Sequence, residues 1–198
     1  MILAPTLLVV STLAAPQPAA DRLQDFSAKD VRQRTVESRA LRGKVVLLGL
    51  ATDKTSPAVV DWQVKLGYQA ATRLGGYGRV AVVSIADVSE FSSWIARPFA
   101  KRTLARTDRD ALERLHALFA ADGADVPPDL DGEVFLVPDW TGEIARSLVP
   151  AAERDRPHLF VVDVEGTVRA HFTENGEAER AEAARVVAAL LAAGGDRP

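Results

Sequence analysis

The sequence predicts an α/β domain built on a mixed β-sheet. Short valine-rich runs alternate with longer segments of helical pattern, and a two-strand hairpin and a final helix follow them. Strands separated by helices favour a parallel sheet covered on both faces, to which the hairpin adds an antiparallel edge. The chain of 198 residues has room for one such domain and shows no internal repeat.

The first strand and helix form the best-defined unit of the sequence. Residues 45–50 are a continuous apolar run after a Gly-Lys turn and predict a buried strand. The helix that follows is expected to have Ser56 as its N-cap and Pro57 in its first helical position. It should end near residue 74, before a glycine-rich stretch. A second buried strand is expected over residues 80–85.

A long helical stretch precedes the next strand. Residues 89–121 are expected to form two helical pieces, because Pro98 lies early and the Thr107-Asp108 pair can start a second piece.

The remaining elements follow in quick succession. A third strand is expected over residues 134–137 and a short helix over residues 141–148. Residues 159–163 and 167–172 flank a Glu-Gly turn, which predicts a hairpin. An alanine-rich amphipathic helix over residues 178–193 is the last element.

The first residues are expected to be an export signal. They are apolar or small, and no charge occurs before Asp21. The run has the length of a signal-peptide core and is too short to span a bilayer comfortably. We expect residues 1–20 to be a signal peptide with a short linker, residues 21–198 to form one domain without a membrane span, and the protein to be periplasmic or secreted. An uncleaved anchor or a buried first strand is the alternative.

The composition excludes several classes of protein. The chain has no cysteine, which removes disulfide exchange, thiol peroxidase chemistry, zinc thiolate sites, iron–sulfur ligation and lipoprotein acylation. Three histidines are too few for a histidine-rich metal site, and no metal or cofactor is expected. A net charge of −3 argues against a nucleic-acid partner.

Several segments together resemble the thioredoxin-like superfamily, in its redoxin and TlpA-like branch. Residues 41–48, LRGKVVLL, are similar to the L-x-G-K-V-V-L-L strand of that branch. Residues 140–146, WTGEIAR, look like its D-x-x-G-E-I-A-R turn and helix, and residues 156–166, RPHLFVVDVEG, look like T-P-x-x-F-V-I-D-x-x-G. The resemblance covers about residues 26–193. It implies a thioredoxin-like fold, a central mixed sheet flanked by helices, in which the proline at position 157 is cis and faces the redox motif.

The redox motif of that family is missing its thiols. In the family the first strand leads into W-A-T-W-C-G-P-C, where this chain reads ATDKTSPA. An alignment without a gap places Thr55 and Ala58 on the two cysteine positions, and a one-residue deletion would place Lys54 and Pro57 there. Either way, the resemblance implies a redox-inactive member.

A second departure from the family lies before the third core strand. Most relatives cross there with a single helix, whereas residues 87–132 have room for two. We expect a helical insertion that serves as partner surface or local packing.

The candidate site is a groove at the start of the first long helix. It comprises Lys54, Thr55, Ser56, Pro57, Ala58, Arg156 and Pro157. Backbone amides at a helix N-terminus can hold a carboxylate, a phosphate or a carbonyl. With Pro157 opposite, the groove could grip an extended peptide, as thioredoxins do. A relic pocket that binds nothing is the alternative.

Other candidate residues are expected to have structural roles. His158 could reach the groove but more simply starts a strand. Asp139 and Asp163 should make turn hydrogen bonds. Trp62 and Trp94 should pack helix faces on the sheet.

A basic group marks the long helical stretch. It consists of Arg97, Lys101, Arg102, Arg106, Arg109 and Arg114. Acidic neighbours offset it in part, so a solvated helix face is expected, with contact to an acidic partner or to anionic headgroups as the alternative.

The sequence therefore predicts an exported thioredoxin-like domain without redox cysteines that binds a protein or peptide and is not an enzyme. No catalytic residue is assigned. The first alternative is a structural, oligomer-forming protein. The second is an enzyme with non-thiol chemistry in the groove, which would need a base or a metal that the sequence does not supply.

Overall fold

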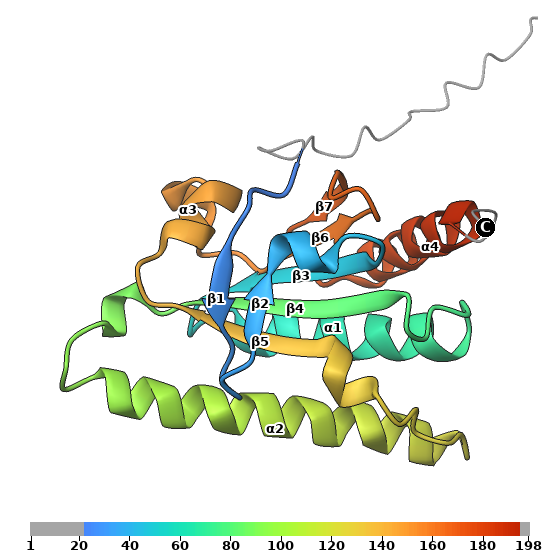
Figure 1. The fold of residues 1–198 in the computed structure, drawn as a ribbon, viewed down its shortest axis with the longest axis horizontal. Helices are drawn as coiled ribbons and strands as arrows, with labels where there is room; N and C mark the ends of the chain where they lie inside the picture. Colours follow the sequence, from blue (N-terminus) through green and yellow to red (C-terminus); the bar gives the residue numbers. More distant parts are fainter. Residues whose placement is uncertain (1–21, 195–198) are drawn as a thin grey trace, which may run out of the picture.

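The structure, a computed structural model, describes residues 22–194. The expected signal peptide and linker lie outside the described residues. The centre of the fold is a five-stranded sheet with the order β5-β4-β3-β6-β7 (Figure 1). Its strands are β3 (Val45–Ala51), β4 (Val80–Asp87), β5 (Val134–Asp139), β6 (His158–Val162) and β7 (Val168–Phe172). Strands β3, β4 and β5 are parallel, and the hairpin of β6 and β7 adds antiparallel pairs, as the sequence predicts.

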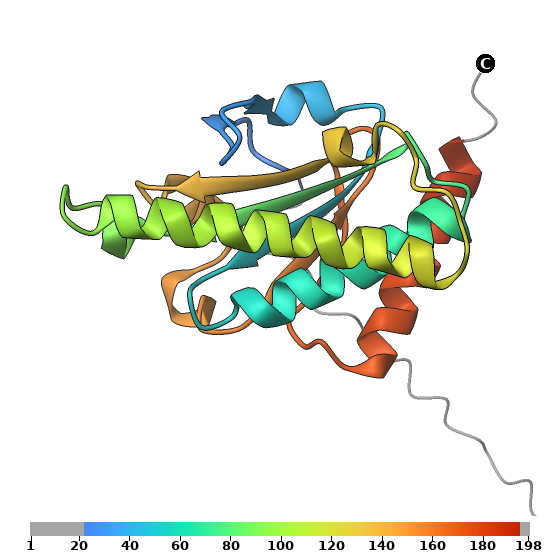
Figure 2. The same ribbon diagram turned by 90° about the horizontal axis from the view of Figure 1, so that it is seen from below.

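Four α-helices accompany the sheet. They are α1 (Ser56–Thr72), α2 (Arg97–Ala121), α3 (Glu143–Leu148) and α4 (Glu177–Gly194). Helices α1 and α4 cover one face, where Trp62 and Leu66 of α1 and Val187 of α4 pack on alternate residues of β3. Helix α2 packs along α1 through Leu115 and Phe119 and runs along the outside of the molecule (Figure 2).

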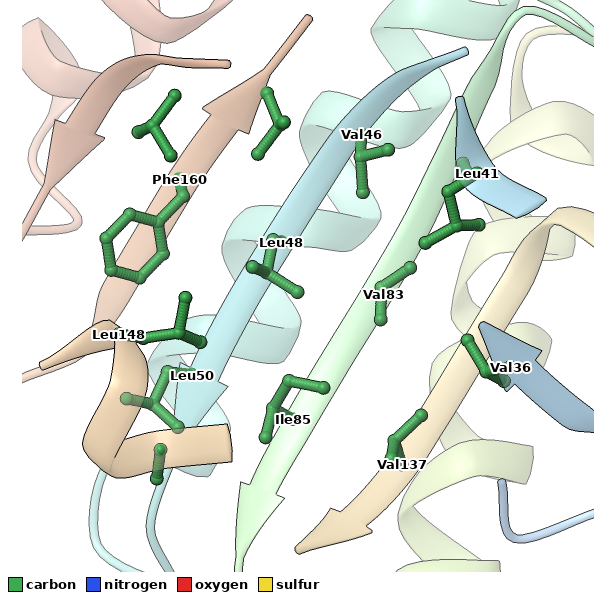
Figure 3. Packing of buried hydrophobic residues seen from close by; sticks show 14 of the residues in the cluster. Val36, Leu41, Val46, Leu48, Leu50, Val83, Ile85, Val137, Leu148 and Phe160 are labelled. Atoms are coloured by element: carbon green, nitrogen blue, oxygen red, sulfur yellow. The ribbon is translucent and has the colours of Figure 1, made fainter. Parts of the chain in front are cut away.

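The other face of the sheet is covered by shorter elements. A small hairpin of β1 (Ser27–Lys29) and β2 (Thr35–Glu37), the 3₁₀ helix η1 (Ser38–Leu41) and α3 pack there. Figure 3 shows the apolar layer between them, in which Leu48, Ile85 and Phe160 meet Leu148 of α3. Every residue of β3 is buried because both faces of this central strand are covered, which explains its uninterrupted apolar sequence.

The β1–β2 hairpin is an element that the sequence pattern does not reveal. Its turn is closed by Asp30, whose carboxylate accepts hydrogen bonds from the backbone and the side chain of Arg34. Arg34 and the neighbouring Arg32 also donate to the backbone carbonyl of Val134 at the start of β5. These arginine contacts hold the hairpin on the domain together with the buried Val36 and the hydrogen bond from the amide of Val31 to the carbonyl of Leu136.

Helix α2 is continuous, so the expected break at Thr107-Asp108 is wrong. Asp108 does not start a second piece, because its carboxylate is buried and accepts two hydrogen bonds from Arg32, at 2.8 and 2.9 Å. Pro98 lies in the first turn of the helix, where a proline is tolerated. The 3₁₀ helices η2 (Ser89–Phe91) and η3 (Leu130–Glu133) precede and follow α2, and η4 (Ala151–Glu153) precedes β6.

Candidate binding cleft

The junction of β3 and α1 is where the redox motif of the resembled family would lie. The N-cap of α1 is Thr55 rather than Ser56, since the carbonyl of Thr55 already accepts the backbone hydrogen bond from Val59, at 3.1 Å. The Thr55 side chain is 6% exposed. Its hydroxyl oxygen accepts a hydrogen bond from the amide of Thr52 at 2.9 Å, so it closes the preceding turn instead of capping the helix.

The backbone amides of this helix start are already bonded within the chain. Ser56 donates to the carbonyl of Thr52 at 3.0 Å, and Ala58 donates to the carbonyl of Thr55 at 3.1 Å. Pro57 has no N–H group to offer. The first turn therefore presents no open set of amides for a carboxylate or a phosphate.

The second half of the predicted groove lies beside the end of β3. The register pairs Leu50 with His158, which places Pro157 next to the point where β3 ends. All peptide bonds between described residues are trans, including Arg156–Pro157, so the chain departs here from the pattern of the resembled family.

An apolar cleft of about 520 Å³ opens on the other side of this junction. It lies between the start of α1, the ends of β3 and β4, η2 and the first half of α2. Its apolar walls include Pro57, Val60, Ala86, Val88, Phe91, Ala96, Phe99, Ala100, Leu104 and Leu136. Among its lining residues the charged ones are Asp53 and Asp87. Ser56 and Pro57 are the members of the predicted groove that line it, whereas Lys54, Thr55, Ala58, Arg156 and Pro157 do not.

A buried glutamine connects α1 to the sheet behind the cleft. The Gln63 amide nitrogen donates to the carbonyls of Leu47 and Val83, at 3.0 and 2.9 Å, and its oxygen accepts from the Ser84 hydroxyl at 2.6 Å. This close approach is possible because residue 49 is a glycine: a Cβ there would lie 2.7 Å from the carboxamide carbon of Gln63. A glycine inside a buried strand and a glutamine on an apolar helix face were the available sequence signals for this contact.

Comparison with known proteins identifies the fold. No protein-family profile and no curated protein matches the chain, but solved structures do. A protein named as thiol:disulfide interchange protein DsbE, from Chlorobium tepidum, superposes with a TM-score of 0.52 at 16% identity over 90% of this chain and 99% of that one. The chain has a thioredoxin-like fold.

Two further thioredoxin-like structures agree with it. A SCO1/SenC family lipoprotein from Bacillus anthracis has a TM-score of 0.51 at 15% identity, covering 89% of this chain and 99% of that one. The exposed lipoprotein thioredoxin Etrx1 of Streptococcus pneumoniae has a TM-score of 0.51 at 14% identity, covering 82% and 99%. This chain differs from an active thiol oxidoreductase in having no cysteine.

His158 has a structural place in the thioredoxin-like domain. Its side chain is 0% exposed and does not line the cleft. Nε2 donates to the carbonyl of Glu153 at 2.9 Å, so in the neutral ring Nδ1 is the acceptor and receives the Nε2 proton of His171, also at 2.9 Å. Burial lowers the pKa of His158, and burial together with the charge of His158 lowers the pKa of His171 to about 4.

The two turn aspartates behave as the sequence predicts. Asp139 accepts from the backbone amide of Ala145 at 2.8 Å, and Asp163 accepts from the amides of Glu165 and Thr167. Burial would raise the pKa of Asp163, but the hydrogen bonds from Thr167, Arg169 and Glu165 and the charge of Arg169 together outweigh burial and lower this pKa.

The two tryptophans that were expected to pack on the sheet differ in exposure. Trp62 is fully buried, as expected, but the expectation for Trp94 is wrong, because its side chain is 85% exposed. Trp94 lies in the loop before α2, beyond the region where that helix contacts the sheet.

Metal binding and membrane spanning find no support in the described part of the chain. Residues 22–194 contain no cluster of three potential metal-ligating side chains. Within the same range, no helix combines the length and the hydropathy that crossing a bilayer requires.

Proposed function

We propose that the protein is an exported, redox-inactive thioredoxin-like domain that binds an apolar segment of another protein in the cleft between α1 and α2. The observation that carries this proposal is the apolar cleft of about 520 Å³ at the carboxyl ends of β3 and β4. In open α/β sheets, ligands bind outside the carboxyl ends of the strands. Without cysteine the domain can hold a partner but cannot exchange a disulfide with it.

The lining indicates the chemistry of the segment. Aromatic and aliphatic side chains form most of the walls, so the segment gains free energy by burying apolar side chains, at about 1.5–3 kcal/mol for each large one. The carboxylate of Asp53 repels an acidic segment, whereas that of Asp87 is paired with Arg154 at 3.5 Å. An apolar segment that is neutral or basic at its ends fits best.

A larger side chain inside the cleft is expected to weaken the binding of an apolar peptide strongly. Ala100 lines the cleft from α2, and an Ala100→Trp side chain would occupy the space. We expect the dissociation constant of a fluorescein-labelled peptide with an apolar centre and lysine ends to rise about tenfold or more, measured by fluorescence anisotropy. The same peptide with glutamate ends should bind more weakly than the lysine version.

Ala105→Trp is the matched control, because Ala105 is exposed on the same helix and does not line the cleft. Equal peptide affinities in the two variants and the wild type would contradict the proposal. A stable dimer that Ala100→Trp converts to monomer in sedimentation velocity would instead identify the cleft as a self-association surface.

The export half of the proposal rests on the uncharged apolar run before Asp21. We expect protein isolated from its native host to begin between Ala15 and Asp21, as read by N-terminal sequencing. A chain that retains Met1 in the cytoplasmic fraction would contradict export and leave the cleft proposal intact.

A further inference from the structure

We propose that the N-terminal half of α2 and the loop before it form a docking surface for an anionic lipid bilayer. This surface, the α2 tip, consists of Trp94, Ile95, Phe99, Arg102, Arg106 and Arg109. The inference goes beyond the binding proposed for the cleft: Phe99 also lines that cleft, but Trp94 and Ile95 do not.

The apolar part of the α2 tip is exposed to an unusual degree. Trp94, Ile95 and Phe99 are 85%, 60% and 66% exposed, and they are three of the five large apolar side chains exposed among residues 22–194. They fall within six consecutive positions at the end of the molecule where the loop before α2 projects (Figures 1 and 2). A contiguous apolar patch of this kind marks an interaction site.

The cations of the α2 tip share a face with Phe99. Positions 99, 102, 106 and 109 recur at the spacing of one helix face, and all four side chains are exposed. Among the described residues, Arg102 and Arg109 have no ion-pair partner, and Arg106 approaches Asp110 at 3.6 Å. Asp108 lies within this stretch, but its carboxylate is buried and paired with Arg32, whereas Asp110 and Glu113 follow the stretch and Glu90 precedes it.

This arrangement is unfavourable for the isolated domain. The N-terminus of a helix carries a partial positive charge, so acidic residues stabilise it and cations do not. The first turn of α2 contains Arg97 and no acidic residue, and the hydroxyl of Ser93 in the loop before it accepts a hydrogen bond from the amide of Ala96 at 3.2 Å. Arg97 itself lies over the ring of Trp140, at 4.6 Å from its centroid. The exposed Trp94 and Ile95, together with the cations that have no ion-pair partner among the described residues, point to an external anionic partner.

The shape of the α2 tip favours a bilayer over a protein. A side chain as exposed as Trp94 projects from the surface, and a rigid partner could accept it only in a matching hollow. A bilayer adapts to such a projection. Tryptophan and phenylalanine partition into the headgroup region, while arginine side chains beside them bind lipid phosphates.

Trp94 supplies a local probe for the test. Trp62 is buried and Trp140 is partly buried, so the red-shifted tryptophan emission of the full chain comes from Trp94. We expect vesicles rich in phosphatidylglycerol to shift this emission to the blue and brominated lipid to quench it. Phosphatidylcholine vesicles should do neither, and added salt should weaken the effect. Trp94→Phe should remove the signal and keep the binding.

Vesicle co-sedimentation of paired variants distinguishes lipid binding by the α2 tip from lipid binding by the rest of the chain. The segment before the domain is identical in all of them, so differences report the tip. Arg102→Gln with Arg106→Gln should weaken binding about twentyfold, and Trp94→Ser with Ile95→Ser should weaken it at least as much. Arg39→Gln with Arg185→Gln changes the net charge equally on exposed cations elsewhere and should have little effect.

Two results would overturn the proposal. One is an unchanged Trp94 emission with anionic vesicles together with equal sedimentation of all variants. The other is a blue shift caused by poly-glutamate but not by vesicles, which would assign the α2 tip to an acidic protein. Peptide binding in the cleft should persist in the Trp94→Ser, Ile95→Ser variant, so the two proposals fail separately.

Discussion

Replacing Gly49 with alanine is expected to lower the free energy of unfolding by about 3 kcal/mol, a large effect for one methyl group. The new Cβ would lie 2.5 Å from Cγ1 of Val59 and 2.7 Å from Cδ of Gln63. Both neighbours are buried in α1 and cannot swing away. The helix must therefore move off the sheet, and the hydrogen bonds of Gln63 to Leu47 and Val83 would lengthen or break.

Urea unfolding followed by circular dichroism measures this loss. Gly132→Ala is the control, because a Cβ at Gly132 meets no atom within 4 Å and the residue does not have a positive φ. The control should change stability by less than about 0.5 kcal/mol. If Gly49→Ala were as stable as the wild type, the close packing of α1 on β3 would be incorrect.

Acidification from pH 6.5 to pH 4.5 is expected to destabilise the domain by about 2 kcal/mol through His171. The pKa of His171 is lowered from 6.5 to about 4 by burial and by His158. Between these values the unfolded chain binds a proton that the folded chain does not bind, so stability falls as the pH falls. The lowered pKa of His158 acts in the same direction. Above about pH 7.5 both rings are almost fully neutral in both states, and the effect disappears.

His171→Gln tests the assignment, because glutamine can still donate a hydrogen bond to Nδ1 of His158 but does not titrate in this range. The pH dependence of the unfolding free energy, from urea titrations at each pH, should become markedly shallower in the variant. The carboxylate of Asp163, whose pKa is lowered from 3.8, loses its contribution to stability only at more acidic pH, so it does not affect this comparison. An identical slope in both proteins would mean that the pair is not held neutral.

The sequence predicts those parts of the fold that apolar runs define. β3, β4 and the β6–β7 hairpin are confirmed, since a strand covered on both faces needs a continuous apolar sequence. The thioredoxin-like fold was suggested by motifs on these same strands. The sequence does not predict the β1–β2 hairpin, because its three-residue strands are held by arginine and aspartate contacts with distant residues.

The candidate site was harder to predict than the fold. The apolar cleft depends on where α2 lies relative to α1 and β4, which no local pattern specifies. Asp108 lies inside α2 with Arg32 as its partner, and that partner is 76 positions away in the sequence. The exposure of Trp94 likewise follows from the projection of the loop before α2, and its neighbours in the sequence gave no sign of it.

Helix α2 is unbroken, so its first half, which lines the cleft, and its second half, which packs on α1, form one rigid element. Its 25 residues span about 37 Å at 1.5 Å per residue. Arg32 fixes its middle at Asp108 and Phe119 fixes its far end in the core, while Leu104 packs on the sheet nearer its start. The half of α2 before Asp108 is about 16 Å long and forms one wall of the cleft, with Phe99 near its start. A sharp kink needs a break in the helix hydrogen bonds, so a displacement of the first turn of α2 would also move the wall of the cleft.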